Sequence, residues 1–325
     1  MTVVVLGIDA LDPDLVDSTT HPHLTLDRHE AIETIVSSAG DPSTHELWPT
    51  IITGLPPEQH GLTVDEGVAW QHPLIAAASR IGDYALPNSI RTKLGAWVLN
   101  YSSEDAFRVP ATYYGDHGLS TVFDDVEART VGIPNYVVDP DTEDREHQLR
   151  RNMGGLFERD TDAKGGHTSA DPETFYERCL EMAMIRIARV RRGIRGRRHE
   201  LVFGYTSGLD LIGHVSHDRP DIQQRAYEEI DQFVGELTGD LREDDELVLV
   251  SDHGLQDGLH TDEAMIASTA PELLEGVSSV TDIRGLIETA LRSGTHIPDS
   301  PWDETASTDE TAARVAEQLE DLGYM

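Results

Sequence analysis

The chain has 325 residues, enough for one large α/β domain or two smaller ones with a sizeable core. Its 60 acidic residues outnumber its 25 Lys and Arg residues, and the net charge of −35 makes nucleic acid and anionic membranes poor general partners. Only Lys93 and Lys164 are lysines. Concentrated salt screens such self-repulsion, so we interpret the acidity as a halophilic trait of solvation and not as a clue to the substrate.

The cysteine count and the apolar patterning indicate a cellular compartment. Cys179 is the single cysteine, so no disulfide framework is expected and a reducing interior fits. The chain begins directly with an apolar strand, and we find neither a signal peptide pattern nor an apolar run of membrane-spanning length. We therefore expect a soluble cytoplasmic protein without a membrane partner.

The first predicted element is an apolar strand over Thr2–Ile8, which ends at Asp9. Pro13 suits the first turn of a helix, so Asp9 has two interpretations. It is either an ordinary N-cap, or a carboxylate exposed at the carboxyl edge of a sheet, where ligands bind in open parallel sheets.

A short strand is predicted over Glu33–Ser38, followed by a helix that begins near Ser43 and Thr44. Apolar residues recur at helical spacing after Thr44, and Gly54 can end the helix in the left-handed conformation. A helix amino terminus favours an anion such as phosphate, which makes Thr44 a candidate nucleophile. The plainer interpretation is that Ser43 and Thr44 are N-caps.

The region from Asp65 to about Glu200 is the most irregular part of the sequence. Strands are indicated at Ala96–Leu99 and Thr130–Val137, but an acidic run over Asp141–Glu146 and several Gly pairs interrupt the pattern. We interpret about 65–195 as partly a cap inserted over the site that selects the substrate. His167 is either an extra ligand or a solvated loop histidine.

A long helix with Phe175, Cys179 and Val190 on its apolar face closes this region. Its last turns are rich in arginine from Arg186 to Arg198. These charges either complement the helix dipole and pair with acidic neighbours, or form a docking patch for a phosphorylated substrate.

A strand is predicted over Leu201–Thr206, and Asp210 and His214 follow it. Their spacing of four puts both side chains on one face of a helical segment, which suits two ligands of one metal ion, although an ordinary polar helix start has the same appearance. An amphipathic helix over about Pro220–Leu241 leads to the next strand.

Leu247–Val250 is a wholly apolar strand, and Asp252 and His253 stand at its end with His260 a short loop away. A further helix is predicted over Ile283–Leu291, and about 303–325 is expected to be an acidic C-terminal tail. His296 ranks below His260 as a ligand. We expect a single domain over 1–325 with a doubly wound, mostly parallel sheet flanked by helices.

Three predicted strands thus end in candidate metal ligands. The set comprises three carboxylates and three imidazoles, from Asp9, Asp210, His214, Asp252, His253 and His260. Mixed oxygen and nitrogen ligands suit two divalent ions such as Zn²⁺ or Mn²⁺ better than Mg²⁺ or Ca²⁺. Two such ions stabilise the entering and leaving oxygens of an in-line displacement at phosphorus, with a hydroxyl at a helix amino terminus as nucleophile.

The motifs resemble the alkaline phosphatase superfamily, specifically its type I phosphodiesterase and nucleotide pyrophosphatase branch. The matching pieces are VVVLGIDAL, STHELWPTIITGLPPEQHGL, GLDLIGH, LVLVSDHG and GLHT. The resemblance implies one metal ion held by Asp210, His214 and His260, and another held by Asp9, Asp252, His253 and the Thr44 oxygen. It also implies attack by Thr44 on phosphorus and a covalent intermediate that water hydrolyses.

The sequence departs from the family beside the nucleophile. Family pyrophosphatases usually have an aromatic residue directly after the nucleophile and an Asn three positions after it, where this chain has His45 and Leu47. A sulfatase is not expected, because no Cys or Ser stands in the required motif. We therefore expect a metal-dependent phosphoric ester hydrolase that acts on a small phosphorylated substrate. The alternatives are a monoesterase or phosphomutase at the same site, and a non-catalytic metal-binding or phosphate-ligand-binding module.

Overall fold

The computed structural model describes residues 1–37, 40–63, 108–138, 149, 153, 156–160, 162–294 and 296. A six-stranded sheet has the order β2-β10-β7-β1-β6-β3. Its strands are β1 (Val3–Ile8), β2 (Arg28–Glu33), β3 (Ala128–Val131), β6 (Leu201–Thr206), β7 (Glu246–Val250) and β10 (Glu263–Ser268). Strands β7, β1, β6 and β3 are parallel, whereas β10 is antiparallel to both β7 and β2. The predicted α/β fold with a mostly parallel sheet is confirmed.

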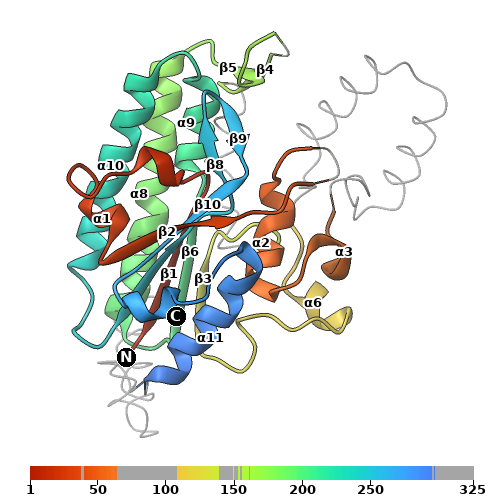
Figure 1. Cartoon of the computed structure of the whole chain (residues 1–325), viewed down its shortest axis with the longest axis vertical. Coiled ribbons are helices and arrows are strands. Elements are labelled where there is room, and N and C mark those ends of the chain that lie inside the picture. Colours follow the sequence, from red (N-terminus) through yellow and green to blue (C-terminus); the bar gives the residue numbers. More distant parts are fainter. Residues whose placement is uncertain are drawn as a thin grey trace, which may run out of the picture.

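Helices cover both faces of the sheet (Figure 1). One layer holds α1 (Pro22–Thr25), α8 (Pro172–Gly196), α9 (Gly208–Val215) and α10 (Pro220–Thr238). The other holds α2 (Thr44–Thr53), α3 (Pro57–His60), α6 (Thr112–Asp116) and α11 (Ile283–Ser293). Smaller elements are the 3₁₀ turns η1 (Pro13–Leu15), η3 (Pro271–Leu274) and η4 (Val280–Asp282), and the hairpins of β4 (Glu158–Arg159) with β5 (His167–Thr168) and of β8 (Gly254–Gln256) with β9 (Leu259–Thr261).

The central strand β1 is apolar throughout because it is buried on both faces. Val4 and Leu6 pack into the core on the side of α8, and Val5 packs into the core on the side of α2. Gly7 makes room for the second of these layers, since a Cβ there would lie only 2.2 Å from the ring of Trp48. The absence of a side chain at this position therefore lets α2 approach the sheet closely.

Two strand predictions were wrong in their bounds. The strand predicted over Glu33–Ser38 shares only Glu33 with β2, which runs over Arg28–Glu33 and pairs with β10. The charged residues of β2 show no apolar run that would mark it as a strand. The strand predicted over Thr130–Val137 is β3, which ends at Val131. Gly132 and Asn135 follow with φ angles of 69° and 56°, which an extended strand does not accommodate.

The helix predictions agree better with the structure. The helix around Phe175 is α8, the helix predicted over about Pro220–Leu241 is α10, and the helix predicted over Ile283–Leu291 is α11. Both β3 and α8 belong to the central fold, although they lie within 65–195. The predicted strand at Ala96–Leu99, the acidic run Asp141–Glu146 and the tail 303–325 lie outside the described residues. The extent of a cap stays a prediction.

The arginine-rich end of α8 pairs with acidic neighbours, as one of the two interpretations held. Arg191 and Arg195 both bind Asp240 after α10, each through a 2.7 Å hydrogen bond, and Arg197 binds Asp245 at 2.9 Å. This end of α8 leads into the amino end of β6, at the edge of the sheet opposite the candidate ligands. These ion pairs therefore hold the carboxyl end of α8 against the segment that connects α10 to β7.

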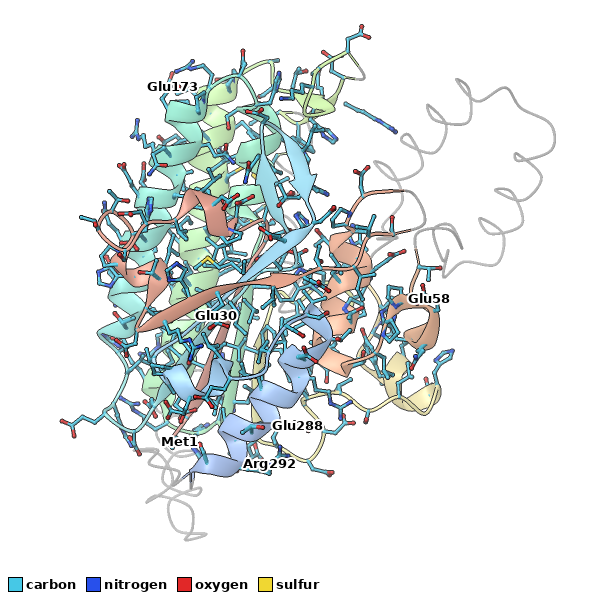
Figure 2. All side chains as sticks on the ribbon, viewed as in Figure 1. Met1, Glu30, Glu58, Glu173, Glu288 and Arg292 are labelled. Atoms are coloured by element: carbon cyan, nitrogen blue, oxygen red, sulfur yellow. The ribbon has the colours of Figure 1, made fainter. Side chains whose placement is uncertain are left out.

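The surface carries the acidic surplus. Figure 2 shows the side chains of Glu58 and Glu173 directed outward at the periphery, and both residues are exposed. Cys179 is buried and makes no disulfide. Within the described part of the chain, no helix combines the length and apolar character needed to span a membrane.

Candidate metal centre and active site

The candidate residues gather at one edge of the sheet because three neighbouring parallel strands end there. The ladders pair the last residues of β1 with the last residues of β6 and β7, so the three carboxyl ends are level. Asp9 follows β1, Asp210 lies in α9 directly after β6, and Asp252 and His253 follow β7. Strand topology thus brings together residues from both ends of the chain.

Asp210, His214 and His260 form a group that we call the rim cluster, because each side chain is 14 to 19% exposed. Helix α9 places Asp210 and His214 one turn apart, as their spacing predicted, with His214 Nε2 3.2 Å from Asp210 Oδ1. His260 comes from β9, and its Nε2 lies 3.4 Å from the same oxygen and 3.0 Å from His214 Nε2. The hairpin of β8 and β9, which the sequence analysis treated as a loop, delivers this third ligand.

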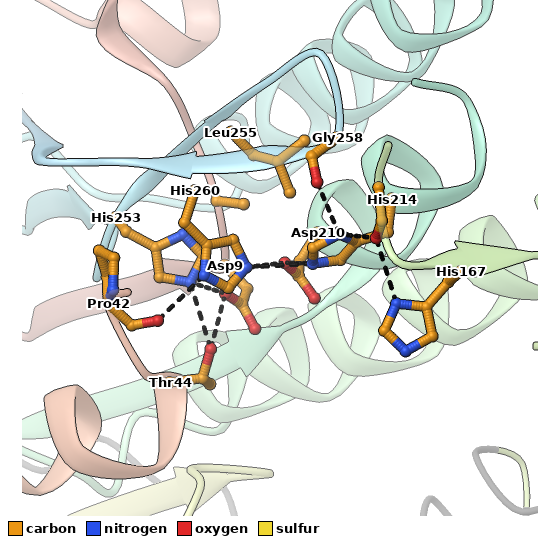
Figure 3. A network of polar contacts seen from close by, with 12 residues as sticks. Asp9, Pro42, Thr44, His167, Asp210, His214, His253, Leu255, Gly258 and His260 are labelled. Carbon is orange, nitrogen blue, oxygen red and sulfur yellow. Dashed lines mark hydrogen bonds and ion pairs between the residues drawn. The ribbon is translucent and has the colours of Figure 1, made fainter. Parts of the chain in front are cut away.

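Asp9, Asp252 and His253 form a second group, the buried cluster, whose side chains are at most 3% exposed. His253 Nε2 lies 3.4 Å from Asp9 Oδ1 and 3.5 Å from Asp252 Oδ2. Thr44 faces this cluster, with its Oγ1 3.3 Å from Asp9 Oδ1 and 3.3 Å from His253 Nε2 (Figure 3). The structure therefore brings all seven predicted site residues into two adjoining groups.

Backbone carbonyls orient all three imidazoles in the same way. A carbonyl oxygen only accepts hydrogen bonds, so each contacting Nδ1 carries a hydrogen, and in a neutral ring the Nε2 then offers its lone pair. The contacts are His214 Nδ1 with the oxygens of Gly165 (3.1 Å) and Gly258 (3.0 Å), His253 Nδ1 with that of Gly254 (3.1 Å), and His260 Nδ1 with that of Pro42 (2.9 Å). Such outer contacts are typical of metal-ligating histidines.

The spacing of the ligand atoms fits shared cations. Tetrahedral ligands at 2.0 to 2.1 Å from one ion lie ~3.3 Å from each other. The separations in the two clusters run from 3.0 to 3.5 Å. In neutral rings the 3.0 Å contact between the Nε2 atoms of His214 and His260 would set two lone pairs against each other, and a shared proton or a metal cation between them relieves this. Nitrogen and oxygen donors suit Zn²⁺ or Mn²⁺.

Burial governs the charges of the buried cluster. It raises the pKa of Asp252 to about 6 and, with the charges of Asp252 and Asp210, raises the pKa of Asp9 well above its usual value. Burial and the charge of His260 lower the pKa of His253. In the metal-free protein, burial thus disfavours the ionised form of both carboxyls and the protonated form of the imidazole.

Ion pairing governs the charges of the rim cluster. Burial alone would raise the pKa of Asp210, but the charge and hydrogen bond of His214, with the bond to His260, hold it well below its usual value. Burial alone would lower the pKa of His260, but Asp210 raises it to about 9. In the metal-free protein the rim cluster therefore favours an ionised carboxylate and protonated imidazoles, whereas the buried cluster favours the neutral forms of both.

Thr44 is the first residue of α2 and lies at the amino terminus of that helix. Ser43 occupies the N-cap position, as predicted, but its side chain makes no capping hydrogen bond. Gly54 ends the helix with a φ of 68°, as predicted. The amino terminus of α2 thus directs partial positive charge toward the buried cluster.

A proline inside α2 ties the helix to a distant segment. Pro49 has no N–H to donate to the carbonyl of His45, four residues earlier. The side-chain amide of Asn135 donates to that oxygen instead, at 2.9 Å. The residues after β3 therefore help to hold the first turn of α2, which carries Thr44.

Tyr205 is a functional neighbour that the sequence analysis missed. Its hydroxyl donates to Asp9 Oδ2 at 2.5 Å, which leaves Asp9 Oδ1 toward Thr44 and His253. Tyr205 is buried, and its ring lies edge-on to Trp48 with a centroid distance of 4.9 Å. The signal available in the sequence was a tyrosine, an aromatic residue with a hydroxyl, one residue before the end of β6.

Other residues that the sequence analysis raised lie outside the two clusters. His167 stands beside His214, with ring centroids 5.4 Å apart, but is not part of the rim cluster. His296 contacts the carbonyl of Met1, at the amino end of β1 and away from the ligands. Leu47, at the position of the family Asn, is buried in the apolar core beside Trp48.

The fold and the site place the chain in a general class of protein. It is an α/β protein with two groups of side chains that could hold metal ions, at the carboxyl edge of a mostly parallel sheet. The sequence model of the type I phosphodiesterase / nucleotide pyrophosphatase family matches residues 3–282. The chain therefore belongs to the type I phosphodiesterase / nucleotide pyrophosphatase family, which confirms the resemblance of its motifs. This is a family of metal-dependent phosphoester hydrolases.

Comparisons with individual proteins gave distant similarities. The PH0037 protein of Pyrococcus horikoshii is 11% identical, with 92% of this chain and 99% of that chain covered and a TM-score of 0.44. Phosphonoacetate hydrolase of Sinorhizobium meliloti 1021 is 15% identical, with 78% of this chain and 56% of that chain covered and a TM-score of 0.40. The alkaline phosphatase of the Antarctic bacterium TAB5 is 10% identical, with 90% and 97% covered and a TM-score of 0.40. No curated protein matched the chain.

Proposed function

We propose that this chain is a two-metal-dependent phosphodiesterase that forms a covalent intermediate on Thr44. One observation carries the proposal. Three Nε2 atoms, three carboxyl groups and one hydroxyl converge, while the Nδ1 atom of every imidazole is bonded to a backbone carbonyl. A purely structural polar cluster has no need to direct all three Nε2 atoms inward.

The rim cluster would hold one ion, and the buried cluster with the Thr44 oxygen would hold the other. Zn²⁺ and Mn²⁺ fit the mixed donors. When bound, two such ions stabilise the negative charge on the entering and leaving oxygens of a displacement at phosphorus.

Thr44 Oγ1 is the nucleophile of the first step. Its hydroxyl lies 3.3 Å from Asp9 Oδ1, the acceptor that orients it and receives its proton. A bond forms between Oγ1 and phosphorus, and the bond from phosphorus to the leaving oxygen breaks, so that the alcohol departs as an alkoxide and takes a proton from a water molecule. The amino terminus of α2 favours the anionic phosphoryl group bonded to Thr44.

The second step returns Thr44 to its free form. The hydroxide left by that water bonds to phosphorus, the bond from phosphorus to Oγ1 breaks, and Oγ1 regains its proton from Asp9. Tyr205 keeps the second oxygen of Asp9 occupied throughout, so the carboxyl cannot rotate away from Thr44.

The test compares bis-p-nitrophenyl phosphate with p-nitrophenyl phosphate, using metal-stripped protein and protein to which Zn²⁺ or Mn²⁺ has been restored. Multimolar KCl is the medium, because we also propose that the acidic surface belongs to a salt-rich cytoplasm. We expect metal-dependent cleavage of the diester. Cleavage of the monoester alone would favour a phosphatase or mutase instead.

Thr44→Ala separates catalysis from binding. We expect turnover to fall by at least ~10³ while both ions stay bound, and Thr44→Ser to restore part of the activity. Ser43→Ala is the matched control, because the neighbouring hydroxyl makes no capping bond. Full activity in Thr44→Ala would contradict the mechanism, and a metal-loaded wild type without hydrolytic activity would favour a binding module.

A further inference from the structure

His167 is held in one orientation beside the rim cluster. Its ring stacks on Phe157 with a centroid distance of 4.1 Å and an interplanar angle of 12°, and Phe157 stacks in turn on Phe175 in α8. Its Nδ1 lies 3.3 Å from the carbonyl oxygen of Gly165, the same oxygen that accepts from His214. Because that oxygen only accepts, the Nε2 of His167 carries a lone pair.

The loop that carries His167 is seated on the rim cluster by close backbone contacts. A Cβ on Gly165 would lie 2.3 Å from the backbone oxygen of His214, and a Cβ on Gly258 would lie 2.7 Å from the Cα of Gly165. Lys164 adds an ion pair with Asp257 at 2.8 Å, in the turn between β8 and β9. The position of His167 is therefore fixed relative to the rim ligands.

Figure 3 shows Thr44 beside Asp9 and His253, and His167 beside His214 toward the other end of the network. Thr44 is at the buried cluster, so the entering oxygen is there. In a two-metal displacement the leaving oxygen is stabilised at the other ion, which places it at the rim cluster. His167 stands beyond that cluster, next to the group that departs.

We propose that His167 determines which alcohol leaves, by accepting through Nε2 a hydrogen bond from a hydroxyl on the leaving group. The inference rests on the proposed diesterase function and specifies its substrate class. The preferred substrates are diesters whose leaving alcohol is itself hydroxylated, such as a glyceryl group. A site built to pair with a hydroxyl discriminates against an analogue that lacks it.

The experiment compares two diesters that differ in the leaving alcohol alone, glyceryl methyl phosphate and propyl methyl phosphate. Release of glycerol or propanol from the metal-loaded protein gives kcat/KM for each. We expect the wild type to prefer the glyceryl ester by about tenfold, the value of one hydrogen bond. His167→Phe keeps a flat ring on Phe157 but has no acceptor, and should reduce the preference to within about twofold.

Two further variants make the result specific. His167→Gln offers an amide oxygen near the position of Nε2 and should recover part of the preference. His117→Phe is the matched control, since His117 also bonds a backbone carbonyl through Nδ1 and stacks on Tyr113, but it lies at the end of α6 away from the ligands. This control should leave the preference unchanged.

Each result either supports or overturns the assignment of His167. Loss of the preference in His167→Phe, with both ions retained, supports the assignment. Equal loss on both diesters, loss of a bound ion, or an unchanged ratio overturns the assignment of His167 while leaving the diesterase function standing. A metal-loaded wild type that cleaves neither diester nor bis-p-nitrophenyl phosphate overturns the proposed function, and this inference with it.

Discussion

The two clusters are built from the same kinds of side chain, yet they carry charge in opposite ways. In the buried cluster the pKa values of Asp9 and Asp252 are raised and that of His253 is lowered, because burial dominates. In the rim cluster the partial exposure of Asp210 and His260 accompanies an ion pair that burial does not overcome. The buried cluster has two carboxyls and one imidazole, whereas the rim cluster has one carboxyl and two imidazoles. Burial together with this difference in composition therefore favours neutral ligands in the first cluster and charged ligands in the second.

The largest effect that tests this comparison is chelation of a metal-loaded protein. We expect the rim ion to leave first, because its ligands are 14 to 19% exposed whereas those of the buried cluster are at most 3% exposed. Diester hydrolysis should fall on the order of 10³-fold with the first equivalent, since the ion stabilises the leaving oxygen. Metal content and activity measured along one time course check this, and simultaneous loss of both ions would contradict it.

The second test compares Asp252→Asn with Asp210→Asn in metal-free protein. The pKa of Asp252 rises from 3.8 to about 6 on folding, so the stabilising contribution of its bound proton is present below pH ~4 and lost as the pH rises through 6. At pH 8 the ionised, buried carboxylate therefore destabilises the fold by up to ~3 kcal/mol relative to acid pH. Asp252→Asn removes this effect and should raise the free energy of unfolding at pH 8.

Asp210→Asn should have the opposite sign at the same pH. The depressed pKa of Asp210 means that its stabilising contribution is present above its unfolded pKa and lost as the pH falls. At pH 8 the variant leaves His260 without the charge that raises its pKa to about 9. Denaturant unfolding of both metal-free variants measures the difference. An equal change in the free energy of unfolding of both variants would show that the two clusters do not differ in charge.

The smallest of the three effects comes from Tyr205→Phe. Loss of the 2.5 Å hydrogen bond to Asp9 should weaken binding at the buried cluster by roughly 10- to 100-fold and leave the rim cluster unchanged. Calorimetric titration of metal-free protein with Zn²⁺ resolves the two sites. Tyr176→Phe is the control, because Tyr176 is buried and its hydroxyl donates to Glu229 Oε1 at 3.1 Å, in a contact between α8 and α10.

Much of this site could be predicted from the sequence, because every candidate ligand except His260 follows an apolar strand or belongs to an i, i+4 pair. Asp9, Asp210, His214, Asp252 and His253 all show one of these two signals. Local patterning also located α2, and with it Thr44. Parallel strands then explain why the ligands meet, since their carboxyl ends share one edge.

The rest depends on contacts that leave no local trace. The carbonyls of Pro42, Gly165 and Gly258 orient imidazoles through backbone atoms, which residue type does not report. The charged strand β2 became visible only through its pairing with β10. Tyr205 read as an ordinary strand residue until the position of Asp9 was known.

The central place of β1 has a consequence for how the chain is made. Val3 pairs with Leu201 on one side and with Glu246 on the other, so this strand has no sheet neighbour until the distant strands β6 and β7 have been synthesised. Pairing over such long sequence separations is slow, and an apolar strand with two open edges invites association with other chains meanwhile. The segment of β1 is thus where a nascent chain most needs shielding.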